Sequence, residues 1–252
     1  MTSTIYLRVH RVDADLCRRA AATSVSDLHE ALHAMGHRTL MSSHMRPILV
    51  GTRIAGPAVT ALCAPGDNLM MHRALSLTQA GDVLVVSCPS ETSGAQWGDM
   101  AARQALRIGL AGVVVQGAIR DIDMLRELRF PAWSTHISPI HPDKRGHGLV
   151  NAPLVCDGVQ VCPGDLIVAD GDGVVVIPAA MAKAAVERAE ARMAAEDRGA
   201  EAILSGQIVW DLSGAALSYA AMEVNERDRA WDDPEDQNVD GRALLIRTDR
   251  GV

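Results

Sequence analysis

The sequence has few aromatic residues and no long apolar run, and both absences narrow the classes of protein it can belong to. Phe, Tyr and Trp make up 3% of the 252 residues, so the core must be built from Val, Ile, Leu, Ala and Met. No apolar run approaches the roughly 20 residues that a transmembrane helix needs. Arg8 also interrupts the short apolar stretch near the start, unlike a signal peptide. We therefore expect neither a membrane protein nor an exported one.

Basic clusters and paired cysteines are missing as well. The formal net charge is −7, and Lys and Arg form no block, whereas a duplex-binding protein normally presents a basic stripe that displaces counterions. An odd number of scattered cysteines is typical of reduced thiols in a reducing compartment. We expect a cytoplasmic protein that does not bind nucleic acid. The five cysteines, none in a Cys-x-x-Cys pair, are Cys17, Cys63, Cys88, Cys156 and Cys162.

What the sequence does contain is a pattern typical of an α/β protein. Residues 82–87 form a continuous apolar run, residues 97–108 have helical spacing with Gly109 as terminator, and residues 113–115 form a second apolar run. Strand, helix and strand within about 35 residues indicate a βαβ unit with parallel strands. We expect residues 117–121 to be the loop after the second strand. The helix side expected to be buried carries Met100, Ala101, Ala105 and Leu106.

The rest of the chain predicts short strands and one long helix. Three strands are predicted between residues 154 and 177, with residues 154–161 as the first, and Pro178 should open the helix. No internal repeat or linker divides the chain, so one domain is predicted over residues 1–225. Residues 226–252 are predicted to form an acidic, mobile tail.

The candidate site lies at the carboxyl ends of the two parallel strands, where ligands collect in α/β proteins. The first loop delivers Gly98 and Asp99 to a helix start, where unpaired N–H groups favour an anion. The second loop delivers Arg120, which can grip a carboxylate and stabilise an enolate. It also delivers Asp121, an oxygen ligand suited to Mg²⁺ or Mn²⁺. This set suits a 2-oxo acid; the alternative is a surface ion pair beside a first-turn acid.

The candidate residues follow one sequence motif, which is Asp99, then twenty residues, and then Arg120-Asp121. In this motif, which is the family's signature, the sequence resembles the class II pyruvate aldolases of the 4-hydroxy-4-methyl-2-oxoglutarate and 4-carboxy-4-hydroxy-2-oxoadipate type. They belong to the superfamily of the regulator of ribonuclease E activity. Further segments that carry the resemblance are Pro65-Gly66-Asp67-Asn68 and residues 81–86, 112–115, 130–134, 151–153, 163–165, 169–174 and 178.

The resemblance implies an α/β fold of the swivelling β/β/α type, assembled as homotrimers or dimers of trimers. It implies a lyase of aromatic catabolism that uses Mg²⁺ or Mn²⁺. Asp121 would be the one direct protein ligand of the metal, and Asp99, Arg120 and Glu196 would be catalytic. Glu196 would reach the site of a neighbouring subunit, although Glu187, Glu190 and Glu201 lie on the same predicted helix. The implied substrate-binding residues are Gly98, Asp99, Met100, Ala101 and Arg120.

Other motifs compete with this interpretation. His29, Glu30 and His33 form a His-Glu-x-x-His string, so a zinc peptidase is the sharpest rival enzyme, although His37 directly follows Gly36 and breaks the longer pattern. Residues 170–173 resemble the opening of a calcium loop, but without a closing Glu they favour a hairpin turn.

The polar segment with His136, His141 and His147 also carries Lys144 and Arg145. We interpret it as a surface loop, with the binding of a second substrate carboxylate as the alternative. Cys88 lies near the proposed site without a histidine partner, which favours a packed thiol.

Three functions remain open from the sequence. The first is a lyase that cleaves 4-hydroxy-2-oxo di- or tricarboxylic acids to pyruvate and an oxo acid, and also decarboxylates oxaloacetate. The second is a binding protein that regulates a ribonuclease without catalysis. The third is a metal-assisted sugar-acid lyase or dehydratase on the same scaffold.

Overall fold

The computed structural model describes residues 2–88, 94–230 and 233 of the chain. It divides into two units, Met1–Arg198 and Gly199–Val252. The division falls inside the span, residues 1–225, that the sequence predicts to be one domain. Most of the predicted acidic tail lies outside the described residues.

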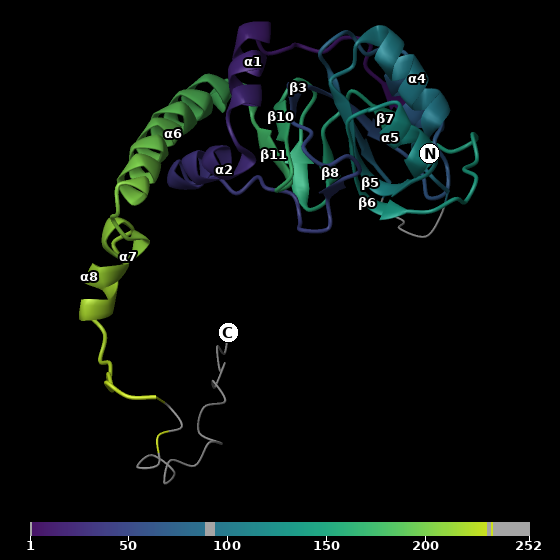
Figure 1. Ribbon diagram of the computed structural model, residues 1–252. Helices are drawn as coiled ribbons and strands as arrows, with labels where there is room; N and C mark the ends of the chain where they lie inside the picture. The colour runs from purple at the N-terminus through teal and green to yellow at the C-terminus, as the bar shows by residue number, and fades with distance from the viewer. Residues whose placement is uncertain (1, 89–93, 231–232, 234–252) are drawn as a thin grey trace. The chain divides into compact units, whose positions relative to one another are not determined.

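A nine-stranded mixed sheet forms the framework of the first unit (Figure 1). Its centre is parallel, because β3, β4, β5 and β6 run in the same direction. In spatial order the main strands are β1 (Thr4–Ile5), β7 (Leu149–Val150), β3 (Ile54–Leu62), β4 (Val83–Ser87), β5 (Gly112–Ile119), β6 (Ala132–Ile137) and β2 (Arg46–Pro47). The remaining two are β10 (Leu166–Ala169), which pairs with β3, and β11 (Val174–Ile177). A separate hairpin consists of β8 (Leu154–Cys156) and β9 (Val159–Val161).

The two halves of the long strand β3 pair with different strands. Its first half, from Ile54 to Pro57, pairs antiparallel with β10, and its second half, from Ala58 to Leu62, pairs parallel with β4. At the change of partner, a Cβ on Gly56 would lie 2.1 Å from the carbonyl oxygen of Gly81. Glycine is therefore required here for the close approach of two backbones.

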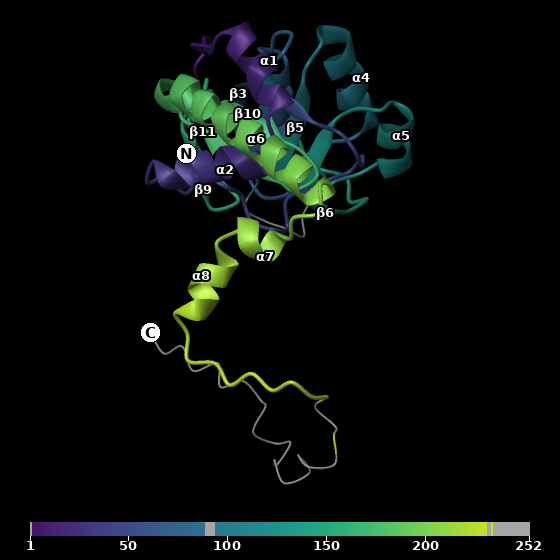
Figure 2. The same ribbon diagram turned by 60° about the vertical axis from the view of Figure 1, so that its left-hand side comes forward.

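Helices cover the sheet on different sides, and strand β4 at its centre is buried along its whole length. The helices of this unit are α1 (Ala14–Ala22), α2 (Val25–Ala34), α3 (Leu69–Leu75), α4 (Asp99–Ile108), α5 (Ile122–Glu127), the 3₁₀ turn η1 (Ala179–Met181) and α6 (Ala182–Leu204). Side chains of α3 and α4 pack on one sheet face, where Leu84 and Val86 point. Val83 and Val85 point to the opposite face, toward the β8–β9 hairpin. Helices α1, α2 and α6 pack on the β10–β11 pair (Figure 2).

The predicted βαβ unit is confirmed, with two corrections. Strand β5 continues to Ile119, so residues 117–119, expected in a loop, belong to the strand. Helix α4 buries Ala102, while Met100 and Leu106 are exposed. The buried side of the helix consists of Ala101, Ala102 and Ala105, which belong to the core cluster on the sheet.

A third correction concerns residues 154–161, predicted as one strand. Asp157 and Gly158 both have positive φ and turn the chain back between β8 and β9. The turn at residues 170–173 is the hairpin that the sequence favours, since β10 and β11 pair across it.

The second unit contains two short helices, α7 (Val209–Leu212) and α8 (Ala215–Ala220). Trp210 and Tyr219 pack edge to face with ring centroids 5.1 Å apart.

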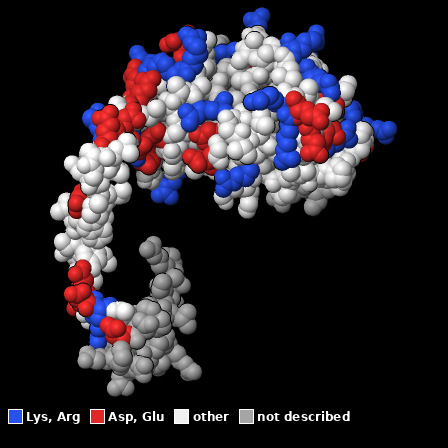
Figure 3. All heavy atoms as spheres, in the orientation of Figure 1, with Lys and Arg blue, Asp and Glu red and all other residues white. Residues whose placement is uncertain are grey.

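In the described ranges, no helix is both long and apolar enough to cross a membrane. Acidic and basic side chains are interspersed on the face that Figure 3 shows.

The buried carboxylate of Asp67 holds two distant segments together. It accepts hydrogen bonds from the backbone N–H groups of Leu69 (2.8 Å), Gly146 (2.7 Å) and Arg145. Burial by itself raises the pKa of Asp67, but these three donors outweigh burial and lower it. The loop after β6 is thereby fixed to the start of α3.

We predict that Gly56→Ala destabilises the first unit by about 1–3 kcal/mol, because the added methyl group must displace the Gly81 backbone. The measurement is the urea midpoint of unfolding. Gly171→Ala is the matched control, since nothing lies within 4 Å of its would-be Cβ and its φ is not positive. Equal midpoints for the two variants would contradict the assigned contact.

We predict that Asp67→Asn costs roughly 1–3 kcal/mol at pH 7, because a charged acceptor of three N–H groups is lost. The folded-state pKa of Asp67 lies below its ordinary value. Its contribution is therefore complete above about pH 4 and is lost as the pH falls through the lowered pKa. Urea unfolding at pH 7 and pH 3 measures this, and the gap between wild type and variant should shrink at pH 3. A gap that widens in acid would show that the carboxylate does not stabilise the fold.

Candidate active site

The site begins where the chain enters helix α4. Gln96 donates its N–H to the carbonyl of Ala118 (2.7 Å), and Arg120 donates its N–H to the carbonyl of Trp97 (3.0 Å). These bonds place the residues before α4 beside the end of strand β5. The loop that precedes the helix and the loop that follows the strand therefore lie against each other.

Gly98 is the N-cap of α4 and lies between the two loops. A Cβ at this position would be 2.6 Å from Oδ2 of Asp121 and 3.2 Å from Cγ of Arg120. The first intrahelical bond runs from Ala102 N–H to the Gly98 carbonyl. The backbone N–H groups of residues 99–101 are thus outside the helical pattern, and those of Met100 and Ala101 are available to an anion.

Arg120 and Asp121 form an ion pair beside this helix start. Their Nε and Oδ2 atoms are 3.3 Å apart, and both side chains are 34% exposed, so the pair is open to a ligand. Asp121 Oδ2 also accepts the N–H of Asp99 at 3.3 Å. Asp121 has φ 59° and ψ 39°, a left-handed conformation that Asp tolerates better than most residues. Arg120 lies 3.4 Å from the ring nitrogen Nδ1 of His141.

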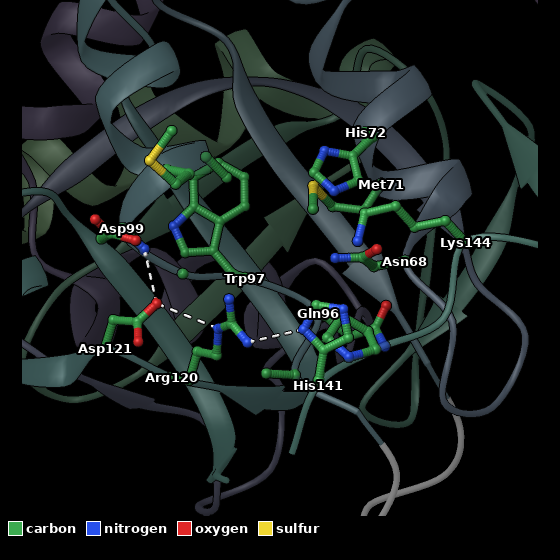
Figure 4. A pocket seen from close by; sticks show the side chains of 15 residues that line it. Asn68, Met71, His72, Gln96, Trp97, Asp99, Arg120, Asp121, His141 and Lys144 are labelled. Carbon is green, nitrogen blue, oxygen red and sulfur yellow. Dashed lines mark hydrogen bonds and ion pairs between the residues drawn. The ribbon is translucent and has the colours of Figure 1, made fainter. Parts of the chain in front are cut away.

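All of these groups line one cavity of about 210 Å³ (Figure 4). Its lining residues are Asn68, Met71, His72, Ala95, Gln96, Trp97, Gly98, Asp99, Met100, Ala101, Arg120, Asp121, His141, Pro142 and Lys144. Trp97 is buried and stacks on Phe130, with ring centroids 5.5 Å apart. This stacked pair therefore supports the part of the cavity that Trp97 lines.

Three buried polar atoms that belong to lining residues have no hydrogen-bond partner: Asn68 Oδ1, Gln96 Oε1 and Trp97 Nε1. Buried polar atoms are normally paired, because an unpaired one costs free energy. Their concentration around one cavity is typical of a site that receives a polar ligand or water.

The structure brings most of the predicted site residues together. Gly98, Asp99, Met100, Ala101, Arg120 and Asp121 all line the cavity. Asp99 lines it from the first turn of α4, where its Oδ2 atom lies 3.4 Å from Nε of Arg103. The chemical roles assigned to these residues stay predictions.

Glu196 is not among the lining residues. It lies on α6 and accepts from Arg192 at 2.7 Å, and Arg192 also contacts Glu30 (2.7 Å) and Asp27 (3.2 Å). A role for Glu196 requires a neighbouring subunit and stays a prediction.

The His-Glu-x-x-His string has an ordinary structural role. The rings of His29 and His33 on α2 are tilted, with centroids 6.2 Å apart, and Glu30 pairs with Arg192. In the described part of the chain, no three His, Cys, Asp or Glu side chains are grouped as metal ligands. Cys88 is buried, and its thiol lies 3.7 Å from the Ala64 carbonyl, as expected for a packed thiol.

The sequence missed several lining residues, above all Asn68 and His72 on α3. The signal was present, because Pro65-Gly66-Asp67-Asn68 is one of the segments that carry the family resemblance. His141 and Lys144 come from the segment interpreted as a surface loop. Both are exposed, yet both line the cavity.

Comparison with known proteins identifies the family of this chain. A sequence model described as RraA-like, Aldolase/RraA, matches residues 25–176. A relative from Halalkalibacterium halodurans named "Putative 4-hydroxy-4-methyl-2-oxoglutarate aldolase" is 34% identical over 192 residues, which cover 76% of this chain and 88% of the relative.

Solved structures show the same fold. A protein from Pseudomonas syringae pv. tomato, described as uncharacterized, has a TM-score of 0.72 and 30% identity over 79% of this chain and 96% of its own. Streptomyces coelicolor RraAS2, described as an unusual member of the RNase ES inhibitor RraA family, has a TM-score of 0.69 and 33% identity over 76% of this chain and 99% of its own. The chain therefore belongs to the RraA-like family of aldolases and RraA proteins.

Proposed function

We propose that the protein is a divalent-metal-dependent lyase that cleaves 4-hydroxy-2-oxo acids to pyruvate and a second oxo acid. The observation that carries the proposal is the convergence of free helix N–H groups, Arg120 and Asp121 on one small cavity. The naming of a curated relative as an aldolase supports the same reaction class.

The substrate carboxylate would bind at the start of α4. The N–H groups of Met100 and Ala101 belong to the first turn of the helix, and the positive end of the helix dipole favours an anion there. Because Gly98 has no side chain, the ligand can approach these N–H groups closely. Arg120 would contact the keto oxygen next to that carboxylate.

The residues at the site fit a hard divalent cation such as Mg²⁺ or Mn²⁺. Mg²⁺ is often held by one or two carboxylates, with water and substrate as its other ligands. Asp121 supplies one partly exposed carboxylate at the cavity, and within the described residues no three metal-ligating side chains are grouped. When bound, the cation would withdraw electrons from the keto group.

The positive charges around the bound substrate would promote cleavage of its C3–C4 bond. The C4 hydroxyl loses its proton, the C3–C4 bond breaks, and C4 becomes the carbonyl carbon of the second oxo acid. The electron pair of the broken bond forms the enolate of pyruvate, whose negative charge Arg120 stabilises. C3 of the enolate finally takes up a proton. Oxaloacetate decarboxylation passes through the same enolate, with CO₂ as the leaving group.

Asp99 is the second carboxylate that lines the cavity, beside Asp121. Its side chain is 26% exposed, and its Oδ2 atom lies 3.4 Å from Nε of Arg103. We assign it to the movement of protons to and from substrate or water.

The second candidate is a surface inhibitor of a ribonuclease, the activity after which the family of the Streptomyces coelicolor neighbour is named. An inhibitor that acts through its surface needs no Arg-Asp pair beside free helix N–H groups. The unpaired polar atoms around the cavity favour the lyase for this chain.

We predict that the protein releases pyruvate from oxaloacetate and from 4-hydroxy-4-methyl-2-oxoglutarate in the presence of Mg²⁺ or Mn²⁺. EDTA should abolish turnover, and added metal should restore it. A coupled assay with lactate dehydrogenase measures pyruvate. No metal-dependent turnover of either acid would favour the inhibitor.

We predict that Asp121→Asn removes metal-dependent turnover while the fold persists, because Asn also tolerates a left-handed backbone. Arg120→Met should lower kcat by roughly 10²–10³, as the loss of an oxyanion donor does elsewhere. Initial rates of pyruvate release measure both effects.

The matched controls change a second Arg-Asp pair outside the cavity. Asp123 and Arg126 are 3.4 Å apart, and the Asp123 side chain is 95% exposed. Asp123→Asn and Arg126→Met should leave the rates within a factor of about two, as a surface ion pair contributes little. Near wild-type rates in Asp121→Asn or Arg120→Met would remove these residues from the site.

A further inference from the structure

Strand β5 is irregular directly before the residues that form the candidate site. Val115 lies opposite Ser134 of β6, and Ala118 lies opposite His136, so three steps along β5 match two steps along β6. One extra residue is therefore inserted into β5, which is the pattern of a β-bulge. It falls in residues 116–117, and we call these two residues the β5 bulge.

The β5 bulge lies where β5 changes its neighbour on the side away from β6. Up to Gln116, β5 pairs with β4. Beyond the bulge, Ile119 forms a parallel bridge with Trp97 in the loop before α4. The bulge thus connects the central sheet to the segment that lies beside the start of α4. A change in its shape would move Arg120 and Asp121 relative to that helix start.

Two hydroxyl groups of β6 bind the backbone of Gly117 in the bulge. Thr135 Oγ1 accepts the N–H of Gly117 at 2.9 Å, and the Ser134 hydroxyl donates to the Gly117 carbonyl at 2.9 Å. The Ser134 hydroxyl also lies 2.6 Å from the carbonyl of His136, so one proton serves two acceptors. The Thr135 hydroxyl can direct its own proton to Nδ1 of His136 (3.0 Å) or to the Gly117 carbonyl (3.3 Å). In either case Thr135 keeps its oxygen as the acceptor for Gly117.

Gly117 depends on these bonds because its own conformational preference is weak. It has φ 139°, a conformation that residues with a side chain rarely adopt. A Cβ here would also lie 3.3 Å from Cγ of Gln96 and 3.4 Å from Cβ of Cys88. Glycine fits this space but has more backbone freedom than any other residue. Contacts from outside the bulge must therefore fix its shape.

We propose that Thr135 is a positioning residue of the proposed lyase: its hydroxyl, together with that of Ser134, holds the β5 bulge and thereby sets the place of Arg120 and Asp121. The inference rests on the proposed function, in which Arg120 contacts the keto acid and Asp121 the metal. Neither Thr135 nor Ser134 lines the cavity. Both act on the site through Gly117.

Thr135→Val tests the inference, because Val keeps the shape of the side chain and removes the acceptor of the Gly117 N–H. With oxaloacetate and Mg²⁺, kcat of the full-length protein should fall by roughly 10–100-fold, as a displacement of about 1 Å at reacting groups costs elsewhere. KM should change little, since the N–H groups at the start of α4 are not part of β5. Thr135→Ser retains the hydroxyl and should restore most of kcat.

Hydrogen exchange tests the position of the chain without catalysis. The N–H groups of Gln96 and Arg120 join the loop before α4 to the end of β5. In Thr135→Val, these two amides should exchange at least about tenfold faster than in wild type, because the local opening that exposes them becomes easier. The amide of Val113, which precedes the bulge and binds the carbonyl of Pro131 (3.1 Å), should keep its rate.

Thr78→Val is the matched control for the loss of a threonine hydroxyl. Thr78 is half-buried, as Thr135 is, and its hydroxyl donates to the carbonyl of Leu75 at 2.8 Å. It does not line the cavity. Whatever the change in its urea midpoint, this variant should keep the kcat of wild type and its exchange rates at Gln96 and Arg120.

The outcomes distinguish this inference from the proposed function. Wild-type kcat in Thr135→Val, unchanged exchange at Gln96 and Arg120, or an equal loss of kcat in Thr135→Ser would overturn it. If wild type releases no pyruvate but Thr135→Val still shows faster exchange at these two amides, the role of Thr135 in placing the site is supported and the proposed function is rejected instead.

Discussion

The pairing of the residues before α4 with the end of β5 is the contact on which the site depends. Two backbone hydrogen bonds, at 2.7 and 3.0 Å, join a loop that starts a helix to a loop that ends a strand. Gly98 allows this approach, because any side chain there would collide with Asp121. The helix N–H groups and the Arg120–Asp121 pair thereby face one cavity. Without this contact, each loop would carry only ordinary surface residues.

A second set of hydrogen bonds, those to Asp67, shapes the other side of the cavity. Asp67 binds backbone N–H groups on both α3 and the loop after β6, and so places Asn68 opposite the helix start. The first contact consists of backbone hydrogen bonds, and in the second a single carboxylate accepts three backbone N–H groups. The unpaired polar atoms of Asn68 and Gln96 are a consequence of this arrangement.

The fold alone does not decide between the activities found in this family. Its members include a relative named as an aldolase and a structure described as belonging to a family of ribonuclease inhibitors, and both resemble this chain at similar identity. The side chains of the site are a better guide to the activity, because the same fold can carry different functions. Here the cavity has charges of both signs beside helix N–H groups, and this arrangement is the basis of the proposed function.

The sequence by itself determined the local elements and half of the site. Apolar runs and a glycine terminator predicted the βαβ unit, and the spacing from Asp99 to Arg120 and Asp121 identified one side of the cavity, because these residues follow adjacent strands along the chain. Tertiary structure decided the rest. Asn68 and His72 lie more than 70 residues before Lys144 in the sequence. Hydrogen bonds to Asp67, together with backbone bonds of Asp143, bring the two segments together. No local pattern reports such a contact, since periodicity describes which face of an element is buried and not what lies opposite it.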